Sequence, residues 1–349
     1  MIKLSWTKVD LLFKKPSGTS RGIITSKPSW ILKLKDDQRP DRHFHGEVSV
    51  IPGLSYDNIF EIENFLNEVC NKVNNFQCIV EDIGFDGFPA VEFGYEMLKY
   101  DYLSKREKIL FKSDFTEGRK SIPINGLIWM GDRRTMFAQV KDKIDYGWKC
   151  IKLKIGGIQF KDELELLKYI RKQYAQTDLE IRLDANGAFS SDDVINKLER
   201  LSDFGIHSIE QPVRQGQIEL MSDLCRISPI PIALDEELIG ISKLQDKKSI
   251  IERIKPHYII IKPSLTGGFN KSEEWISIAA DYHIGFWITS ALESNIGLNA
   301  IAQWTATMNP GIPQGLGTGG LFTNNFESPL TLTGSELKYD KSKKWKLSI

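Results

Sequence analysis

Cysteines are scarce in this sequence, and they are not spaced as metal ligands. The 349 residues include four cysteines, none in a C-x-x-C pair. This spacing gives little support to a cysteine-ligated metal site. The first residues also lack the basic segment and long apolar run of a secretory signal peptide. We therefore expect reduced cysteines and a cytoplasmic location.

The sequence also lacks an excess of charge and any long apolar run. Lysine plus arginine equals aspartate plus glutamate, 46 against 46. A neutral chain gives no electrostatic reason to expect nucleic acid as a partner. The longest apolar stretches have the length of strands and fall short of a membrane span. We therefore expect neither a nucleic-acid nor a membrane partner, and the oligomeric state, a homo-oligomer included, stays open.

The length suits a barrel-sized domain with a smaller companion, and the first part of the chain has the pattern of an α+β module. Strand-like runs at 31–34 and 46–50 precede apolar positions at helical spacing over 57–74. A second helix is predicted to start near Pro89, because proline is tolerated in a first helical turn. Strands followed by helices predict an α+β domain over residues 1–120.

From about residue 122, short β-rich runs alternate with amphipathic helical segments. The predicted strands are 122–127, 150–155, 180–184, 208–210, 231–235, 258–261, 285–289 and 314–316. Eight such strands predict a (β/α) barrel over residues 121–320. A glycine-rich stretch replaces the helix after the last strand, and we expect the tail, 321–349, to pack back on the first module.

Charged residues end the second to sixth predicted strands at a regular spacing. They are Lys154, Asp184, Glu210, Asp235 and Lys262, at successive intervals of 30, 26, 25 and 27 residues. One βα unit of a barrel takes roughly 30 residues, so each residue occupies the same place in its unit. That place is the carboxyl end of a strand, where barrel enzymes assemble their active sites.

Two lysines share one face of the strand at 150–155. Since alternate side chains of a strand point the same way, Lys152 and Lys154 are predicted to point into the barrel mouth. Lys262 would face Lys154 across that mouth. Mutual repulsion and burial of two ammonium groups lower a lysine pKa toward a value useful for a general base.

Three carboxylates follow apolar strand residues, where an unpaired charge is costly. A hard cation would satisfy Asp184, Glu210 and Asp235 together. Mg²⁺ fits oxygen ligands best, with Mn²⁺ as the alternative. Histidine and cysteine are absent from these strand ends, which argues against zinc. Each acid taken singly would pass as a helix cap or surface residue, but three at matched positions favour a metal site.

Taken together, these residues resemble the enolase superfamily, in the muconate-lactonizing-enzyme-like branch with lysines on the second and sixth strands. The matching segments are Lys152-Leu153-Lys154, Leu183-Asp184-Ala185-Asn186, Ile209-Glu210-Gln211-Pro212, Leu234-Asp235-Glu236 and Ile261-Lys262-Pro263-Ser264. The resemblance covers nearly the whole chain. It implies a modified (β/α)₇β barrel with an N-terminal α+β capping domain, a Mg²⁺ site and lysine bases.

Within that branch the chain resembles the o-succinylbenzoate synthase family. Four segments carry this resemblance: Phe88–Gly94, Ile124–Leu127, Ser290–Ser294 and Gly315–Gly319. It implies Mg²⁺-dependent dehydration of a small carboxylate, 2-succinyl-6-hydroxy-2,4-cyclohexadiene-1-carboxylate, to o-succinylbenzoate in menaquinone synthesis, a lyase reaction.

The resemblance also assigns roles to residues. It implies that Lys154 removes the α-proton and helps the hydroxyl leave, Lys152 lies beside the substrate carboxylate, and Lys262 stabilises the enediolate. Asp184, Glu210 and Asp235 would hold Mg²⁺. The candidates for substrate contacts are Ser290, Gly317, Thr318 and Arg21.

Two alternatives remain open at this point. A dipeptide epimerase or N-acylamino-acid racemase of the same branch would use the same metal and lysines. Dipeptide epimerases usually carry an Asp-x-Asp pair near the eighth strand, whereas Gly315–Gly319 here contains no acid. The other alternative is a catalytically inactive barrel that acts as a binding protein. The complete set of acids and lysines argues against it, because buried charges without a function are costly.

Overall fold

The structure is a computed structural model that describes residues 1–19 and 22–347. Arg21, one of the predicted substrate contacts, lies outside these residues. Among the described helices, none combines the length and the apolar content that crossing a bilayer requires. The four cysteines are free thiols, three buried and one exposed.

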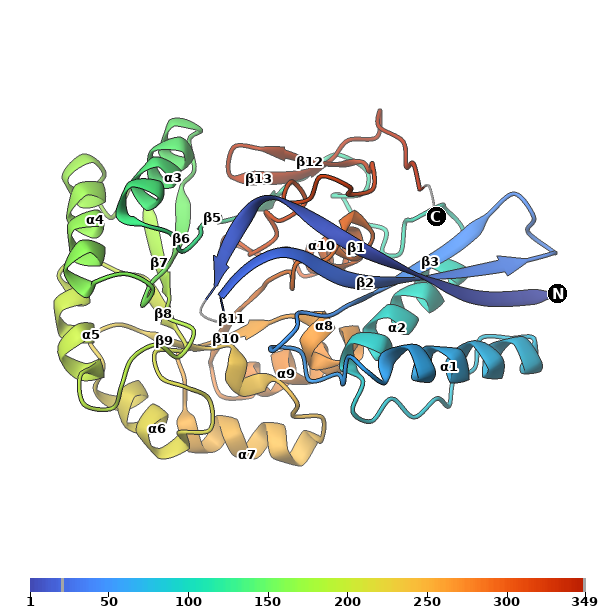
Figure 1. The fold of residues 1–349 in the computed structure, drawn as a ribbon, viewed down its shortest axis with the longest axis horizontal. Helices are drawn as coiled ribbons and strands as arrows, with labels where there is room; N and C mark the ends of the chain where they lie inside the picture. The colour runs from blue at the N-terminus through green and yellow to red at the C-terminus, as the bar shows by residue number, and fades with distance from the viewer. Residues whose placement is uncertain (20–21, 348–349) are drawn as a thin grey trace.

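An antiparallel sheet and two helices form the N-terminal part of the molecule (Figure 1). Its elements are β1 (Ile2–Thr19), β2 (Gly22–Asp36), β3 (His43–Ser49), α1 (Ile62–Phe76) and α2 (Pro89–Leu103). The runs predicted at 31–34 and 46–50 fall on β2 and β3, and strands do precede helices. The first and longest strand, β1, is missing from the sequence prediction.

Both predicted helices of this part are present, but only one of them begins where it was predicted. Pro89 is the first residue of α2, as predicted. The helix predicted over 57–74 begins only at Ile62. Asp57 instead caps the other helix, because its carboxylate accepts hydrogen bonds from the backbone N–H groups of Ala90, at 3.0 Å, and Val91, at 3.4 Å. The segment before Ile62 is therefore held as a turn.

The β1–β2 ribbon buries opposite faces at its two ends. Leu4 is buried in the core of the N-terminal part, with α1 and α2. Further along, Leu11 and Phe13 are buried on the other face, against Phe322 near the other end of the chain. The ribbon therefore reaches from the N-terminal sheet to the strands of the barrel, as Figure 1 shows, and Gly18 forms a β-bridge with Met130 there.

Seven parallel strands form a curled sheet in the order β5 to β11. They are β5 (Gly126–Ile128), β6 (Cys150–Lys154), β7 (Glu180–Asp184), β8 (Ser208–Glu210), β9 (Ile232–Leu234), β10 (Tyr258–Ile261) and β11 (Gly285–Ile288). The helices between them are α3 (Arg133–Asp145), α4 (Phe160–Gln173), α5 (Val194–Ser202), α6 (Ile218–Ile227), α7 (Leu244–Ile254), α8 (Pro263–Thr266) and α9 (Gly268–Asp281), and α10 (Asn295–Thr307) follows β11. Helices α3 to α7 lie along the outer side of the strands (Figure 1).

The predicted first and eighth strands differ from the observed ones. The run predicted at 122–127 divides into β4 (Ile122–Pro123), which leaves the barrel, and β5. The run predicted at 314–316 makes only isolated parallel bridges, Gln314 with Ile124 and Gly315 with Thr289. Gly315 lies so close to Thr289 that an added Cβ would be 2.4 Å from its Oγ1. Two bridged residues thus close the sheet, and the fold is the predicted modified barrel with an N-terminal cap.

The C-terminal segment pairs with β4. Its strands, β12 (Leu330–Thr333) and β13 (Glu336–Tyr339), form an antiparallel sheet with β4. The ring of Tyr339 packs edge-on against Phe115, with centroids 5.9 Å apart. The division into a capping domain (1–120), a barrel (121–320) and a tail (321–349) stays our proposal.

Candidate active site

Two lysines of β6 line a cavity at the carboxyl ends of the strands. Lys152 and Lys154 line this cavity of about 200 Å³, whereas Ile151 and Leu153 between them are buried in the barrel core. This is the alternation that the strand pattern predicted. Lys262, directly after β10, lines the same cavity, and three strands of the sheet, β7 to β9, lie between β6 and β10.

Three carboxylates end the strands between the lysines. Asp184 ends β7, Glu210 ends β8, and Asp235 directly follows β9. Asp184 and Glu210 are register partners in the parallel ladder, so their side chains stand side by side. All three side chains are buried. The regular spacing in the sequence thus corresponds to adjacent positions along one edge of the sheet.

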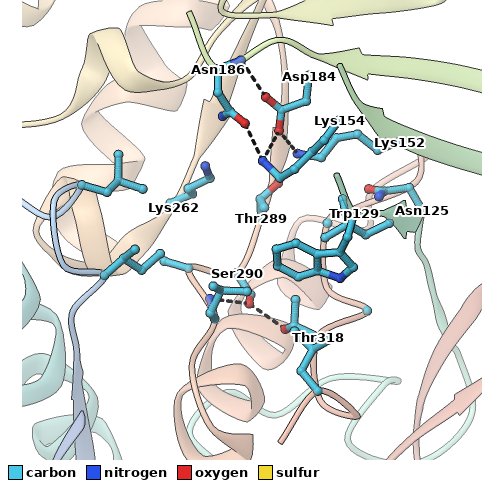
Figure 2. A pocket seen from close by; sticks show the side chains of 18 of the residues that line it. Asn125, Trp129, Lys152, Lys154, Asp184, Asn186, Lys262, Thr289, Ser290 and Thr318 are labelled. Carbon is cyan, nitrogen blue, oxygen red and sulfur yellow. Dashed lines mark hydrogen bonds and ion pairs between the residues drawn. The ribbon is translucent and has the colours of Figure 1, made fainter. Parts of the chain in front are cut away.

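Each carboxylate is paired with a lysine. The ammonium nitrogen of Lys152 lies 2.8 Å from Glu210 Oε2 and 3.2 Å from Asp184 Oδ2. Lys154 Nζ is 3.1 Å from the same Asp184 oxygen, and Lys262 pairs with Asp235. Figure 2 shows Lys152 and Lys154 on Asp184, with Lys262 entering from another side of the cavity.

The expectation that a neighbouring ammonium group and burial lower the lysine pKa is wrong for Lys152. Burial lowers the pKa of Lys152, but the carboxylates of Glu210 and Asp184 raise it by more, so the net pKa lies above its usual value. Burial likewise lowers the pKa of Lys262, and the charge of Asp235 reverses that effect. The sequence places only the other lysine beside Lys152, whereas the fold brings carboxylates close to the ammonium groups of Lys152 and Lys262.

The carboxylates respond to the same charges in opposite directions. Burial raises the pKa of Asp184, but Lys154 and Lys152 lower it by more, so this carboxyl stays ionised far below its usual range. Burial raises the pKa of Glu210 above its usual value, and the negative charge of Asp184 adds to the effect against the opposing charge of Lys152. Asp184 and Glu210, on neighbouring strands, therefore compete for the positive charge of Lys152.

The donor set fits a divalent cation, although the side chains do not converge on one point here. Among the described residues, no group of three or more histidine, cysteine, aspartate or glutamate side chains is arranged to hold a metal ion. The ammonium group of Lys152 lies between Asp184 and Glu210 instead. Nevertheless, Glu210 Oε1 is buried and has no hydrogen-bond partner. An unpaired carboxylate oxygen beside two further acids is the chemistry that Mg²⁺ prefers.

Asn186 and Glu236 belong to the site and were not predicted as site residues. The side-chain oxygen of Asn186 accepts a hydrogen bond from Lys154 at 2.6 Å, and its NH₂ group donates to Glu236 at 2.9 Å. Both residues line the cavity. The available signal was their position, because Asn186 comes two residues after Asp184 and Glu236 directly follows Asp235. Asn186 thus orients the Lys154 ammonium group.

The predicted substrate contacts Ser290, Gly317 and Thr318 line the opposite part of the cavity. The hydroxyl oxygens of Ser290 and Thr318 are 2.7 Å apart (Figure 2). Trp129 and Asn125 line the same wall and were not predicted. Asn125 lies within Ile124–Leu127, one of the segments that carry the family resemblance. Trp129 has no sequence signal, since a single tryptophan in a loop after a strand is more often a packing residue.

Apolar side chains form most of the remaining wall. They include Ile24 of the β1–β2 ribbon, Leu54 of the cap, and Leu127, Leu292 and Leu321 of the barrel and tail. Both ends of the chain thus contribute to one cavity. An apolar chamber with a charged floor accommodates a ligand that has an apolar body and an anionic group.

The fold and the site together define a capped barrel protein with a polar strand-end site. Residues 135–334 match the family described as enolase C-terminal domain-like. An o-succinylbenzoate synthase of Desulfotalea psychrophila is 46% identical over 96% of this chain and 98% of its own length. The chain therefore belongs to the enolase superfamily and, within it, to the o-succinylbenzoate synthase family.

Solved structures agree with this membership. The crystal structure of MenC from Desulfotalea psychrophila superposes with a TM-score of 0.84 at 42% identity, covering 97% of this chain and 99% of that one. Muconate lactonizing enzyme from Pseudomonas fluorescens has the same fold, with a TM-score of 0.79 at 20% identity, over 99% of this chain and 96% of its own. An L-amino acid-D/L-Glu epimerase of Sulfurimonas denitrificans is more distant, at 26% identity over 73% of this chain and 74% of its own length.

Proposed function

We propose that this protein is an o-succinylbenzoate synthase, a lyase that dehydrates 2-succinyl-6-hydroxy-2,4-cyclohexadiene-1-carboxylate in menaquinone synthesis in the cytoplasm. One observation carries the proposal. A chain 46% identical to an o-succinylbenzoate synthase has a cavity in which Lys152, Lys154 and Lys262 meet strand-end carboxylates.

Lys154 is our candidate for the base. Its ammonium nitrogen is held by Asp184 and by the Asn186 amide oxygen, both at the cavity wall. In the proposed reaction, deprotonated Lys154 takes the proton from the carbon next to the substrate carboxylate. The C–H electron pair becomes a C=C bond, the C–O bond breaks, and the hydroxyl leaves as water with the proton returned by Lys154.

The remaining charged groups stabilise the negative charge that grows on the substrate carboxylate. Lys152 lies on β6 and Lys262 directly follows β10, and the pKa values of both ammonium groups lie above the usual one. Both therefore stay positively charged where charge grows on the oxygens. A divalent cation, Mg²⁺ or in its place Mn²⁺, would be held by Asp184, Glu210 and Asp235 and would supply Lewis-acid stabilisation of that charge.

The substrate body fits the apolar part of the chamber. Trp129 and Leu127 line the cavity and offer apolar side chains to a six-membered ring. Ser290, Gly317 and Thr318 offer hydroxyl and backbone N–H groups to the succinyl chain. Arg21 stays a candidate for a carboxylate contact from the cap.

The proposal is tested by a direct assay. Purified protein with Mg²⁺ is incubated with the cyclohexadiene substrate, and formation of o-succinylbenzoate is followed by absorbance and chromatography. Dipeptides and N-succinylamino acids are tested in parallel for exchange of the α-proton with deuterated solvent. Dehydration supports the proposal, whereas racemisation without dehydration transfers the assignment to the epimerase and racemase relatives.

A further inference from the structure

A fourth lysine reaches the cavity from outside the sheet. Lys143 lies in the last turn of α3, which packs on β5. Together with Trp148, which precedes β6, it lines the same cavity as Lys152 and Lys154. Because both residues line the cavity, it extends past β5 toward α3, and we call this extension the arm. Among the described residues, the isolated bridges of Gln314 and Gly315 close the sheet at this place.

Lys143 differs from the other lysines of the cavity wall in its partners. Lys152, Lys154 and Lys262 are each paired with a carboxylate. Within the described part of the chain, the Lys143 ammonium group makes no ion pair and no hydrogen bond; its contact is the indole ring of Trp148, with Nζ 4.4 Å from the ring centroid. A cation over an aromatic face is held in place while its N–H groups remain available.

The surrounding backbone makes room for this pair. A Cβ added to Gly126 of β5 would lie 3.0 Å from Lys143 Cδ and 3.0 Å from the Trp148 ring. A Cβ added to Gly317 would lie 3.7 Å from the same ring. The Lys143–Trp148 pair is therefore packed against the Gly317–Thr318 segment, where hydroxyl and backbone N–H groups also face the cavity.

The surroundings of the Lys143 ammonium group favour the binding of an anion. Burial lowers the pKa of its ammonium group, and the charge of Asp142, the neighbour in sequence, opposes that only in part. A carboxylate brought into the arm would restore the charge balance and gain a charge-assisted hydrogen bond.

We propose that Lys143 binds the second carboxylate of a dicarboxylate substrate, the one at the end of the acyl chain. The inference rests on the proposed function, in which the first carboxylate lies between Lys152 and Lys262. The acyl chain then runs past Ser290 and Gly317 to the ammonium group on Trp148. A substrate with an ammonium group at that end is repelled, so Lys143 selects acidic acyl chains over dipeptides.

The test compares ligands that differ only at the end of the chain. The dissociation constants of o-succinylbenzoate and of 2-butyrylbenzoate, which has a methyl group in place of the terminal carboxylate, are measured by calorimetry with Mg²⁺. Variants are Lys143→Met, which keeps the packing on Trp148, Lys143→Arg, which keeps the charge, and Lys141→Met, an exposed control on the same helix. Steady-state dehydration is measured for each.

The expected result is selective. Lys143→Met weakens o-succinylbenzoate binding roughly 10- to 100-fold, as loss of a charged hydrogen bond predicts, and raises KM with kcat little changed. Binding of 2-butyrylbenzoate stays the same, Lys143→Arg recovers most of the affinity, and Lys141→Met behaves as wild type. Equal weakening of both ligands, or unchanged o-succinylbenzoate binding, overturns the inference. Wild-type protein that binds o-succinylbenzoate but does not dehydrate the substrate counts against the proposed function alone.

Discussion

The ammonium nitrogen of Lys152 lies 2.8 Å from Oε2 of Glu210, while the other oxygen of that carboxylate, Oε1, is buried and has no hydrogen-bond partner. A cation held by Glu210 would therefore share the negative charge of this carboxylate with Lys152. The lysine satisfies one oxygen, and the second remains available to a cation.

Replacement of Lys152 by methionine should therefore separate metal affinity from turnover. Removing a positive charge beside the carboxylates strengthens Mg²⁺ binding by roughly 10-fold, because unit charges a few ångströms apart interact by about 1 kcal/mol or more. Turnover should fall at least 100-fold, since the substrate carboxylate loses an ammonium group. Calorimetric titration with Mg²⁺ and the dehydration assay measure the two effects. Lys149→Met, at an exposed position, is the control, and weaker Mg²⁺ binding in Lys152→Met would contradict the shared-charge account.

Removal of the metal should abolish the reaction. We expect EDTA to eliminate dehydration and excess Mg²⁺ to restore it. Glu210→Gln should weaken Mg²⁺ binding roughly 10-fold or more, because affinity for a hard cation depends on the charge of its oxygen ligands. Glu199→Gln, exposed on α5, should leave the affinity unchanged. Full activity in EDTA would remove the metal from the proposal.

Lys154→Ala should inactivate the enzyme without unfolding it. The side chain is held by Asp184 and Asn186 at the cavity wall, and loss of a general base costs about 10²- to 10⁴-fold in kcat. The far-ultraviolet circular dichroism spectrum should match wild type, and exposed Lys161→Ala serves as the control. Turnover within a few-fold of wild type would exclude Lys154 as the base.

Gly46 is required where β3 meets α2. A Cβ at this position would lie 2.0 Å from the carbonyl oxygen of Gly94 on the helix, so the two elements would have to separate. We expect Gly46→Ala to lower the free energy of unfolding by about 1–3 kcal/mol, as overpacking usually does. Urea denaturation measures the change. Gly84→Ala, where an added Cβ meets nothing within 4 Å, should be neutral or slightly stabilising, and equal losses in both variants would refute the close-approach argument.

Glu96 should give the unfolding free energy a pH dependence. Its carboxylate on α2 caps α9, accepting hydrogen bonds from the backbone N–H groups of Phe269 and Asn270, and burial raises the pKa of Glu96 to about 7. The folded protein therefore keeps a proton that the unfolded chain releases, starting from its ordinary value of 4.5. This contribution to stability is fully present below the unfolded pKa and is lost as pH rises through the folded one.

The measurement is a difference between wild type and Glu96→Gln. Between pH 4.5 and 7 the wild type should lose about 3 kcal/mol relative to the variant, read from urea denaturation at several pH values. Glu68→Gln, exposed on α1, should follow the wild-type curve. A constant difference between wild type and Glu96→Gln across this range would show that Glu96 does not titrate with folding.

The barrel was readable from the sequence because its periodicity is local. Strand-end residues about one βα unit apart predicted Asp184, Glu210 and Asp235 side by side, and the structure has them at the ends of neighbouring strands. The alternation in β6 predicted which face carries the lysines. The prediction that failed was the lowered pKa of Lys152. This pKa depends on carboxylates from other strands, and no sequence pattern contains their distances from the lysine.

β1 was not predicted from the sequence, for a different physical reason. A strand that buries one face throughout shows a single alternation of apolar residues. In β1 the apolar residues change phase, with Ile2, Leu4 and Trp6 at even positions and Leu11 and Phe13 at odd ones. The two halves pack against different cores on opposite faces. Lys143 was not predicted as a site residue because its proposed role depends on the opening beside β5, which no sequence pattern indicates.

The contact between the β1–β2 ribbon and the segment around Thr323 affects the order in which parts of the protein can form during synthesis. The backbone oxygen of Leu12 accepts a hydrogen bond from the N–H of Thr323 at 2.8 Å, and these residues are 311 positions apart. During synthesis Leu12 leaves the ribosome 311 residues before its partner Thr323. The wall that the ribbon contributes to the cavity can therefore close only after Thr323 has been synthesised, so the cavity is completed after all of the strands β5 to β11 have been made.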